Sequence, residues 1–154
     1  MPGPAANQVL VLNGPNLNML GNREPEIYGR QTLGEIETAC HGKASELGLT
    51  IDFRQSNNEG EIVEWIQQTD AKASGVIINP AAYTHTSIAI MDALLQCACP
   101  VIEIHLSNIF QRESFRHHSY VSPAAHGMIC GFGGDSYLLA LEAMARLLRE
   151  REQS

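Results

Sequence analysis

The chain has no long apolar run and few basic residues, and both scarcities restrict what it can do. No stretch of its 154 residues approaches the roughly 18 apolar residues that cross a bilayer, so we expect no membrane-spanning segment. Seventeen acidic residues outnumber ten basic ones, which leaves a net charge of −7. That charge argues against nucleic acid or an anionic membrane as a partner.

Nucleotide-binding, metal-binding and secretion motifs are also missing. The turn at residues 14–21 fits neither GxGxxG nor GxxxxGK[ST], so we expect no nucleotide cofactor. The Cys97–Cys99 pair alone is not a zinc pattern, and no metal is expected. Residues 1–8 have neither a basic start nor an apolar core, so we expect a flexible N-terminal extension, a cytoplasmic protein and free thiols.

What is present is typical of one globular domain. The chain is 44% hydrophobic and 18% charged, and its length predicts a single catalytic domain over residues 1–154. Short apolar runs predict five strands, at residues 8–13, 49–55, 75–79, 100–105 and 128–130. Helical spacing predicts intervening helices at residues 32–47, 59–68, 87–96 and 134–149. In the third helix, Ile88, Met91 and Leu95 share one stripe.

Alternating strands and helices predict an α/β fold. The arrangement that satisfies right-handed crossovers is a flavodoxin-like, doubly wound, five-stranded parallel sheet of order 2-1-3-4-5, with helices on both faces. Ligands of such sheets bind beyond the carboxyl ends of the strands. The first, third and fourth strands end in polar residues, at 13–16, 79 and 105–108. We therefore predict one polar crevice there, bordered by the long connections 14–31 and 106–127.

Acid–base candidates lie at this crevice. Glu103 and His105 leave the same face of a strand, and a carboxylate beside an imidazole suits a general acid, although a buried ion pair is the plain alternative. Tyr28 lies in a polar loop, 21–30, that has the composition of a lid. A loop arginine, joined by Arg112 or Arg116, would stabilise a tyrosinate; a surface tyrosine packed on its own loop is the alternative.

Other polar residues leave the third strand. Asn79 and His85 are exposed candidates for ligand contact, and Thr86 or Ser87 is a candidate helix cap. Asp92 follows His85 by seven residues, on about the same helical face. Capping and solvation explain most of this segment without a function.

Four motifs together resemble the type II 3-dehydroquinate dehydratases over residues 9–148. They are LNGPNLNMLG with REP and YG at 12–29, NPAAYTHTS at 79–87, EIHLSN at 103–108, and Arg112 with FRHHSY at 115–120. The resemblance implies a flavodoxin-like fold and a homododecamer, a tetramer of trimers. It also implies reversible dehydration of the small anionic substrate 3-dehydroquinate to 3-dehydroshikimate, without cofactor or metal, in the shikimate or the quinate pathway.

The resemblance also implies roles for individual residues. Tyr28 is similar to the base that removes the proton next to the ketone, and Arg23 to the residue that favours its anion. Asn16 is similar to the residue that holds a water against the enolate. His105 is similar to the acid that protonates the leaving hydroxyl, and Glu103 to its partner. The substrate contacts of the family correspond to Asn79, His85, Asp92 (from a neighbouring subunit), Leu106, Ser107, Arg112 and Arg116.

Two other functions fit a flavodoxin-like fold. An FMN electron carrier would need a phosphate-cradling first loop, and residues 14–21 are of the wrong kind. A hydrolase would need a nucleophile at the crevice, and none is found. The chain has only two lysines, Lys43 and Lys72, and both are predicted on or beside helices away from the crevice. An imine mechanism, which the type I enzymes use, therefore has no candidate lysine.

Overall fold

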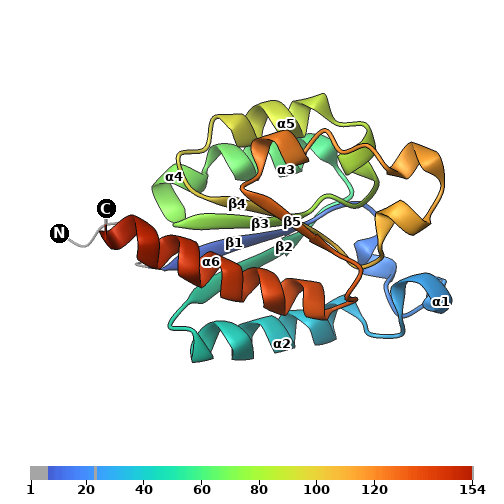
Figure 1. Cartoon of the computed structure of the whole chain (residues 1–154), viewed down its shortest axis with the longest axis horizontal. Coiled ribbons are helices and arrows are strands. Elements are labelled where there is room, and N and C mark those ends of the chain that lie inside the picture. Colours follow the sequence, from blue (N-terminus) through green and yellow to red (C-terminus); the bar gives the residue numbers. More distant parts are fainter. Residues whose placement is uncertain (1–6, 23, 154) are drawn as a thin grey trace.

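Five parallel strands form one sheet in the order β2-β1-β3-β4-β5, as predicted (Figure 1). The computed structural model describes residues 7–22 and 24–153, with only the backbone at 71 and 72. The strands are β1 (Gln8–Asn13), β2 (Thr50–Gln55), β3 (Gly75–Asn79), β4 (Val101–His105) and β5 (Gly127–Cys130). Because Gln8 already belongs to β1, the expected extension over residues 1–8 cannot include it; residues 1–6 lie outside the described part.

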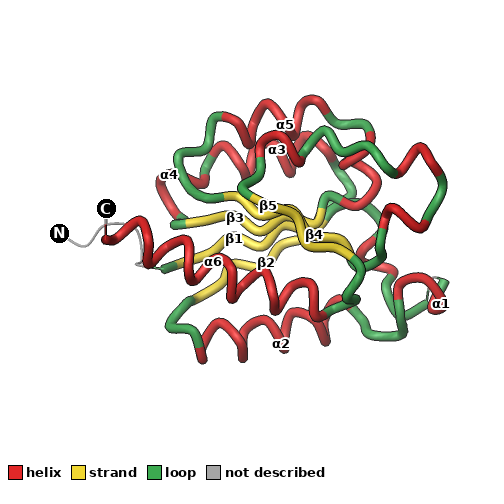
Figure 2. The backbone as a smooth tube through the Cα atoms, viewed as in Figure 1, coloured by secondary structure: helices red, strands yellow, loops and turns green. Residues whose placement is uncertain are grey.

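Helices cover both faces of the sheet (Figure 2). The helices are α1 (Pro25–Tyr28), α2 (Leu33–Glu46), α3 (Glu59–Gln67), α4 (Thr69–Lys72), α5 (Ile88–Leu95) and α6 (Asp135–Gln153). The short α1 and α4 were not expected from the sequence. Within the described residues, no helix is both long and apolar enough to span a bilayer.

The sheet has a hydrophobic core on each face, and the side chains of a strand pack alternately into the two cores. Val9 and Val11 pack with α2 and α6, whereas Leu10 and Leu12 pack with α3 and α5. All four side chains are buried. Burying a single such side chain contributes about 1.5–3 kcal/mol, so the two cores hold the strand ends firmly in register.

Side-chain caps set where the main helices begin. Thr32 and Glu35 form a capping box at the start of α2, and Ser87, one of the two candidate caps, accepts from the Ile90 amide to cap α5. The stripe noted on α5 is not its buried face. Ile90 is fully buried, whereas Ile88 is 52% and Leu95 58% exposed. The helix therefore presents an apolar stripe away from the sheet.

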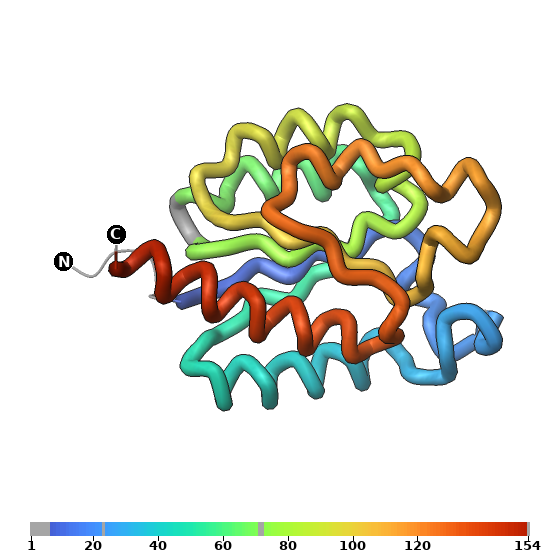
Figure 3. Tube along the Cα trace, in the orientation of Figure 1, coloured from blue at the N-terminus to red at the C-terminus, as the bar shows by residue number. Residues whose placement is uncertain are grey.

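The carboxyl ends of the strands and the long connections meet at one end of the molecule. Figure 3 shows α1 and the connection after β4 at this end, and the end of α6 at the opposite one. The connection after β4 contains three 3₁₀ turns, η3 (Ile109–Gln111), η4 (Ser114–Arg116) and η5 (Ser122–Ala124), and a further turn, η2 (Ala81–His85), follows β3. The crevice predicted from the sequence lies among these segments.

Candidate active site

A cavity opens at the carboxyl ends of β1, β3 and β4. It encloses about 610 Å³, including its open mouth. Nine of the predicted site residues line it: Asn16, Tyr28, Asn79, His85, His105, Leu106, Ser107, Arg112 and Arg116. Arg112 and Arg116 supply the charged side chains among the described lining residues. The cavity therefore suits an anion although the whole chain is acidic.

A second hollow of about 810 Å³ lies at the opposite ends of the strands. Its lining includes Asn7, Ser74 and Cys99, which precede β1, β3 and β4. Open parallel sheets bind ligands at the carboxyl ends of their strands. This hollow also lacks a paired base and acid, so the smaller cavity is the better site.

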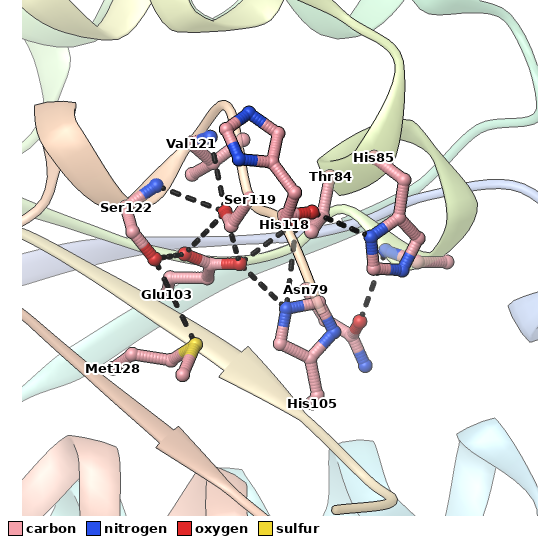
Figure 4. Close-up of polar contacts among 11 residues, drawn as sticks. Asn79, Thr84, His85, Glu103, His105, His118, Ser119, Val121, Ser122 and Met128 are labelled. Carbon is pink, nitrogen blue, oxygen red and sulfur yellow. Dashed lines mark hydrogen bonds and ion pairs between the residues drawn. The ribbon is translucent and has the colours of Figure 1, made fainter. Parts of the chain in front are cut away.

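Glu103 and His105 form a buried pair on β4 (Figure 4). The His105 Nε2 atom lies 2.6 Å from Glu103 Oε2, and the Glu103 side chain is wholly buried. Nε2 therefore faces the carboxylate. His105 also lines the cavity, so the pair lies where it could transfer a proton to a ligand and is not enclosed in the core.

Hydroxyl groups surround the Glu103 carboxylate. Thr84 Oγ1 donates to Oε2 over 2.8 Å, and Ser119 Oγ donates to both carboxylate oxygens, at 2.9 and 3.0 Å. Ser122 Oγ donates to Oε1. Burial by itself would raise the pKa of Glu103, but the hydrogen bonds from His105, Ser122 and Thr84 hold this pKa below its ordinary value.

His85 lies beside His105 in the cavity. The two rings are stacked, with centroids 6.4 Å apart, and His85 Nδ1 is 2.8 Å from the His118 carbonyl oxygen. A carbonyl only accepts, so this contact places a proton on Nδ1 and leaves Nε2 to face other partners. Burial, together with the nearby charges of His105 and Arg116, lowers the pKa of His85. His85 is thus a neutral hydrogen-bonding group.

Tyr28 contacts an arginine from a distant part of the chain. Arg112 Nη1 donates to Tyr28 Oη over 2.8 Å, and the guanidinium carbon lies 5.1 Å from the ring centre. Of the two arginines left open by the sequence, Arg112 makes this contact. A guanidinium that donates to a phenol oxygen stabilises the phenolate. Arg23, the other predicted partner, lies outside the described residues.

The first loop is held against the ends of β2 and β3. The Gly14 amide donates to the Asn79 carbonyl over 2.8 Å, and a Cβ at Gly14 would lie 2.4 Å from the Pro80 carbonyl oxygen. Only glycine permits this approach. The Asn16 amide donates to Asn57 Oδ1 over 2.9 Å, and Asn16 has a left-handed backbone, φ 70°. These contacts fix the backbone of Asn16 at the cavity, which Asn16 lines.

A buried hydrogen-bonded chain holds Asn79. Asn79 Nδ2 donates to Tyr137 Oη over 2.9 Å, and that hydroxyl donates to Asn13 Oδ1 over 2.6 Å. Burial raises the pKa of Tyr137, which therefore stays a neutral phenol. Asn79 is only 2% exposed, so the expectation of an exposed side chain was wrong. Asn79 nevertheless lines the cavity, and the hydrogen bond to Tyr137 on α6 orients its side chain.

Among the described residues, two of the predicted site residues do not line the cavity. Glu103 lies behind His105, as its predicted role as a partner requires. Asp92 is exposed on α5, whereas His85 belongs to η2; these are separate elements, and only His85 reaches the cavity. The expectation of one shared helical face was therefore wrong.

The sequence analysis missed Thr84, Ser119, Ser122, Asn13 and Tyr137 as site-supporting residues. Thr84, Ser119 and Asn13 belong to motifs that were quoted, but nothing local assigned them a partner. Their contacts join positions 16 to 124 residues apart in the chain. A buried glutamate in a strand was the available signal, because a buried carboxylate requires donors from somewhere.

The cysteines and histidines show no metal site in the part of the chain that the structure describes. No three His, Cys, Asp or Glu side chains gather there in an arrangement that would hold an ion. All four cysteines are free thiols, as expected. Cys99 is buried and Cys97 is half-buried. Burial raises the pKa of the Cys40 thiol to about 12.

Comparisons with known proteins agree with the geometry. The family model described as "Dehydroquinase class II" matches residues 7–145. The 3-dehydroquinate dehydratase 2 of Pseudomonas aeruginosa is 60% identical over 137 residues, 89% of this chain and 93% of that protein. The 3-dehydroquinate dehydratase of Brucella abortus is 58% identical over 146 residues, 95% of this chain and 93% of that protein.

Solved structures give the same result. The type II dehydroquinase of Propionibacterium acnes superposes with a TM-score of 0.88 at 46% identity and covers 94% of this chain and 99% of its own. The type II dehydroquinase of Butyrivibrio crossotus superposes with a TM-score of 0.87 at 39% identity, covering 90% and 97%.

Proposed function

The chain belongs to the class II dehydroquinase family, and we propose that it dehydrates 3-dehydroquinate to 3-dehydroshikimate with Tyr28 as base and His105 as acid. One observation carries this proposal. A phenol held by a guanidinium and an imidazole held by a buried carboxylate line the same cavity. The names of the relatives supply the substrate.

Tyr28 and His105 fit the two proton transfers of the reaction. Removal of the proton beside the ketone needs a base, and the Tyr28 oxygen, which accepts a hydrogen bond from Arg112 at the cavity wall, is the group that would take it. Departure of the hydroxyl needs an acid. Since Nε2 of His105 faces Glu103, the opposite ring nitrogen, Nδ1, donates to the leaving oxygen.

The enolate formed between these steps needs stabilisation. Asn16 lies on the cavity wall, where its amide can bind a water against the enolate oxygen. The family roles of Asn79, His85, Arg116 and the backbone amides of Leu106 and Ser107 are to hold the substrate, and all five residues line the cavity. Positioning of this kind converts binding energy into rate.

The two lysines support an enolate rather than an imine. Lys43 is absent from the described cavity wall, and the backbone of Lys72 lies on α4, an element that contributes no described residue to this wall. Lys43 lies on α2, where its Nζ atom is 2.7 Å from a carboxylate oxygen of Glu142. The contact with Glu142 raises the pKa of Lys43, which further disfavours the neutral amine that forms a Schiff base.

We also propose that the enzyme is a homododecamer, a tetramer of trimers, in which Asp92 completes the site of a neighbouring subunit. Asp92 is exposed and outside its own cavity, and it lies between the exposed Ile88 and Leu95 on α5. An apolar stripe around a carboxylate suits a subunit contact. Sedimentation equilibrium should give the mass of twelve chains; a monomeric mass would contradict the proposal.

The activity is tested by adding the purified protein to 3-dehydroquinate and following the ultraviolet absorbance of the conjugated product. We expect the absorbance to rise in proportion to enzyme and to approach an equilibrium. Treatment with borohydride in the presence of substrate should leave the enzyme active, since no imine forms. Absence of any rise across the pH range in which the protein is folded would refute the function.

A further inference from the structure

The hydroxyls of Thr84, Ser119 and Ser122, here called the hydroxyl cage, surround a carboxylate that the reaction itself does not touch. They come from three segments, η2, the loop before η5 and η5, and meet at Glu103 (Figure 4). With the His105 ring they direct four donors at two carboxylate oxygens. Four donors around one carboxyl group favour its charged form, so this arrangement stabilises Glu103 as a carboxylate.

The donor direction of Ser119 is fixed by its other contacts. Its Oγ atom accepts from the amides of Val121 and Ser122, at 3.1 and 3.0 Å. Because both lone pairs are then engaged, the remaining capacity of the hydroxyl is its proton, which goes to Glu103. Ser119 therefore cannot turn to accept a proton from a protonated Glu103.

Thr84 and Ser122 point their protons the same way. Thr84 is wholly buried, and its Oγ1 atom lies 2.8 Å from Glu103 Oε2 and 3.4 Å from His105 Nε2. Ser122 Oγ is also 3.7 Å from the sulfur of Met128. A thioether is a weak acceptor, so the Ser122 proton goes to the carboxylate. A proton on Glu103 would have to displace one of these donors.

We propose that Thr84, Ser119 and Ser122 are positioning residues for the dehydration: their hydroxyls hold Glu103 as a carboxylate, and this carboxylate keeps the Nε2 proton of His105 in place so that Nδ1 serves the substrate. The proposal rests on the proposed function. It adds a role for three residues that do not line the cavity.

The hydroxyl cage also links Glu103 to the connection after β4, which carries Arg112 and Arg116. Ser119 and Ser122 follow Arg112 and Arg116 on one connection, and the Tyr120 amide donates to the Thr84 carbonyl over 2.8 Å. Val121, between the two serines, is wholly buried in the core. The hydrogen bonds to Glu103 thus anchor this loop at the position where its arginines meet the cavity.

The ionisable groups that interact with Glu103 are few. His105 on β4 is the direct partner, and His85 from η2 interacts with both Glu103 and His105. Arg116 from η4 acts on His85. Burial lowers the pKa of His85 and so disfavours its charged form, and the groups that lower the pKa of Glu103 are His105 and the hydroxyls.

The experiment compares Thr84→Val, which replaces the hydroxyl by a methyl of similar size, with Thr84→Ser, which keeps it. Loss of one hydrogen bond to a charged group predicts a fall in kcat of about tenfold to a hundredfold in Thr84→Val, with KM changed by less than about threefold. Thr84→Ser should keep most of the activity. Thr69→Val is the matched control, because Thr69 is also buried and its hydroxyl bonds the Trp65 carbonyl and Cys97 rather than Glu103.

A second readout does not require turnover. Infrared titration of each full-length protein, with the spectrum of Glu103→Gln subtracted, reports the pH at which Glu103 becomes a neutral carboxyl. We expect this midpoint to move upward by about one unit or more in Thr84→Val and in Ser122→Ala. It should not move in Thr69→Val. Ser122→Ala removes one donor to Glu103 and, unlike a change at Ser119, leaves no backbone amide without its acceptor. It serves as the test variant if Thr84→Val fails to fold.

The two readouts separate the possible failures. A wild-type protein without dehydratase activity refutes the proposed function, while the infrared midpoints still decide whether the hydroxyls hold the carboxylate. Folded Thr84→Val and Ser122→Ala with wild-type kcat overturn the proposal. A lower kcat with an unmoved midpoint also overturns it, because the hydroxyls would then act through something other than Glu103.

Discussion

At the scale of the residue, the site consists of ordinary groups placed beside unusual neighbours. Tyr28 lies under a guanidinium and His105 beside a buried carboxylate. The sequence motifs pointed to both groups, and both line the cavity; spacing on the strand predicted the Glu103–His105 pair. The partner of Tyr28 could not be chosen from the sequence, because Arg112 reaches it across 84 positions of chain.

Replacement of Arg112 tests the contact with Tyr28. Arg112→Ala should lower kcat about tenfold to a hundredfold, because a charge-assisted hydrogen bond to the base, about 1.5–3 kcal/mol, is lost. Steady-state kinetics on 3-dehydroquinate provide the measurement. Arg146→Ala, an exposed substitution of the same charge on α6, is the control. Equal kcat in the two variants would show that Arg112 does not support the base.

At the scale of the element, strands ended where the sequence predicted because apolar runs give way there to polar residues and glycine. Their ends then meet by geometry alone, which is why the cavity could be located in advance. The hydrogen bonds that hold the cavity side chains in place could not be predicted in the same way. Asn79 depends on a phenol from α6, and Glu103 depends on hydroxyls from the long connection after β4.

The approach of β1 to β3 gives a prediction at this scale. Gly14→Ala places a Cβ 2.4 Å from the Pro80 carbonyl oxygen, so the first loop must move. We expect a loss of about 1–3 kcal/mol of stability, together with lower activity as Asn16 shifts. Chemical denaturation and kinetics measure the two effects.

Gly42→Ala is the matched control for this substitution. Gly42 lies in the middle of α2, and nothing lies within 4 Å of the added Cβ. Alanine there should stabilise the protein by about 0.5–1 kcal/mol and leave kcat unchanged. If Gly14→Ala behaved like Gly42→Ala, the close approach at the strand ends would not constrain the site.

At the scale of the whole molecule, an acidic protein presents a basic cavity because its charge is unevenly distributed. The net charge is −7, yet the charged side chains on the described cavity wall are Arg112 and Arg116. The composition predicted the absence of broad polyanion binding and could not predict this local concentration. The exposed stripe on α5 was likewise invisible in the sequence, where apolar spacing indicates a helix face but not what covers it.

The buried Glu103 makes the stability of the molecule depend on pH. Its pKa is lower in the folded protein than in the unfolded chain, because hydrogen bonds from His105, Ser122 and Thr84 outweigh burial. The resulting stabilisation is complete above the unfolded value, about 4.5, and is lost as the pH falls through the folded value.

Thermal unfolding across this acidic range tests whether the stabilisation from Glu103 is lost as the pH falls. Wild-type protein should lose more stability than Glu103→Gln as the pH falls from about 6 to below 4. Parallel curves for the two proteins would show that Glu103 has the same proton affinity folded and unfolded.

The most direct test of the central claim is the rate of enone formation from 3-dehydroquinate by Tyr28→Phe beside the wild type. Phenylalanine keeps the ring under the Arg112 guanidinium and removes only the oxygen that we propose takes the proton. We predict a loss in kcat of at least about a hundredfold, within the range of a general base, with substrate binding retained by calorimetry. Turnover by Tyr28→Phe within a few-fold of the wild type would contradict the account.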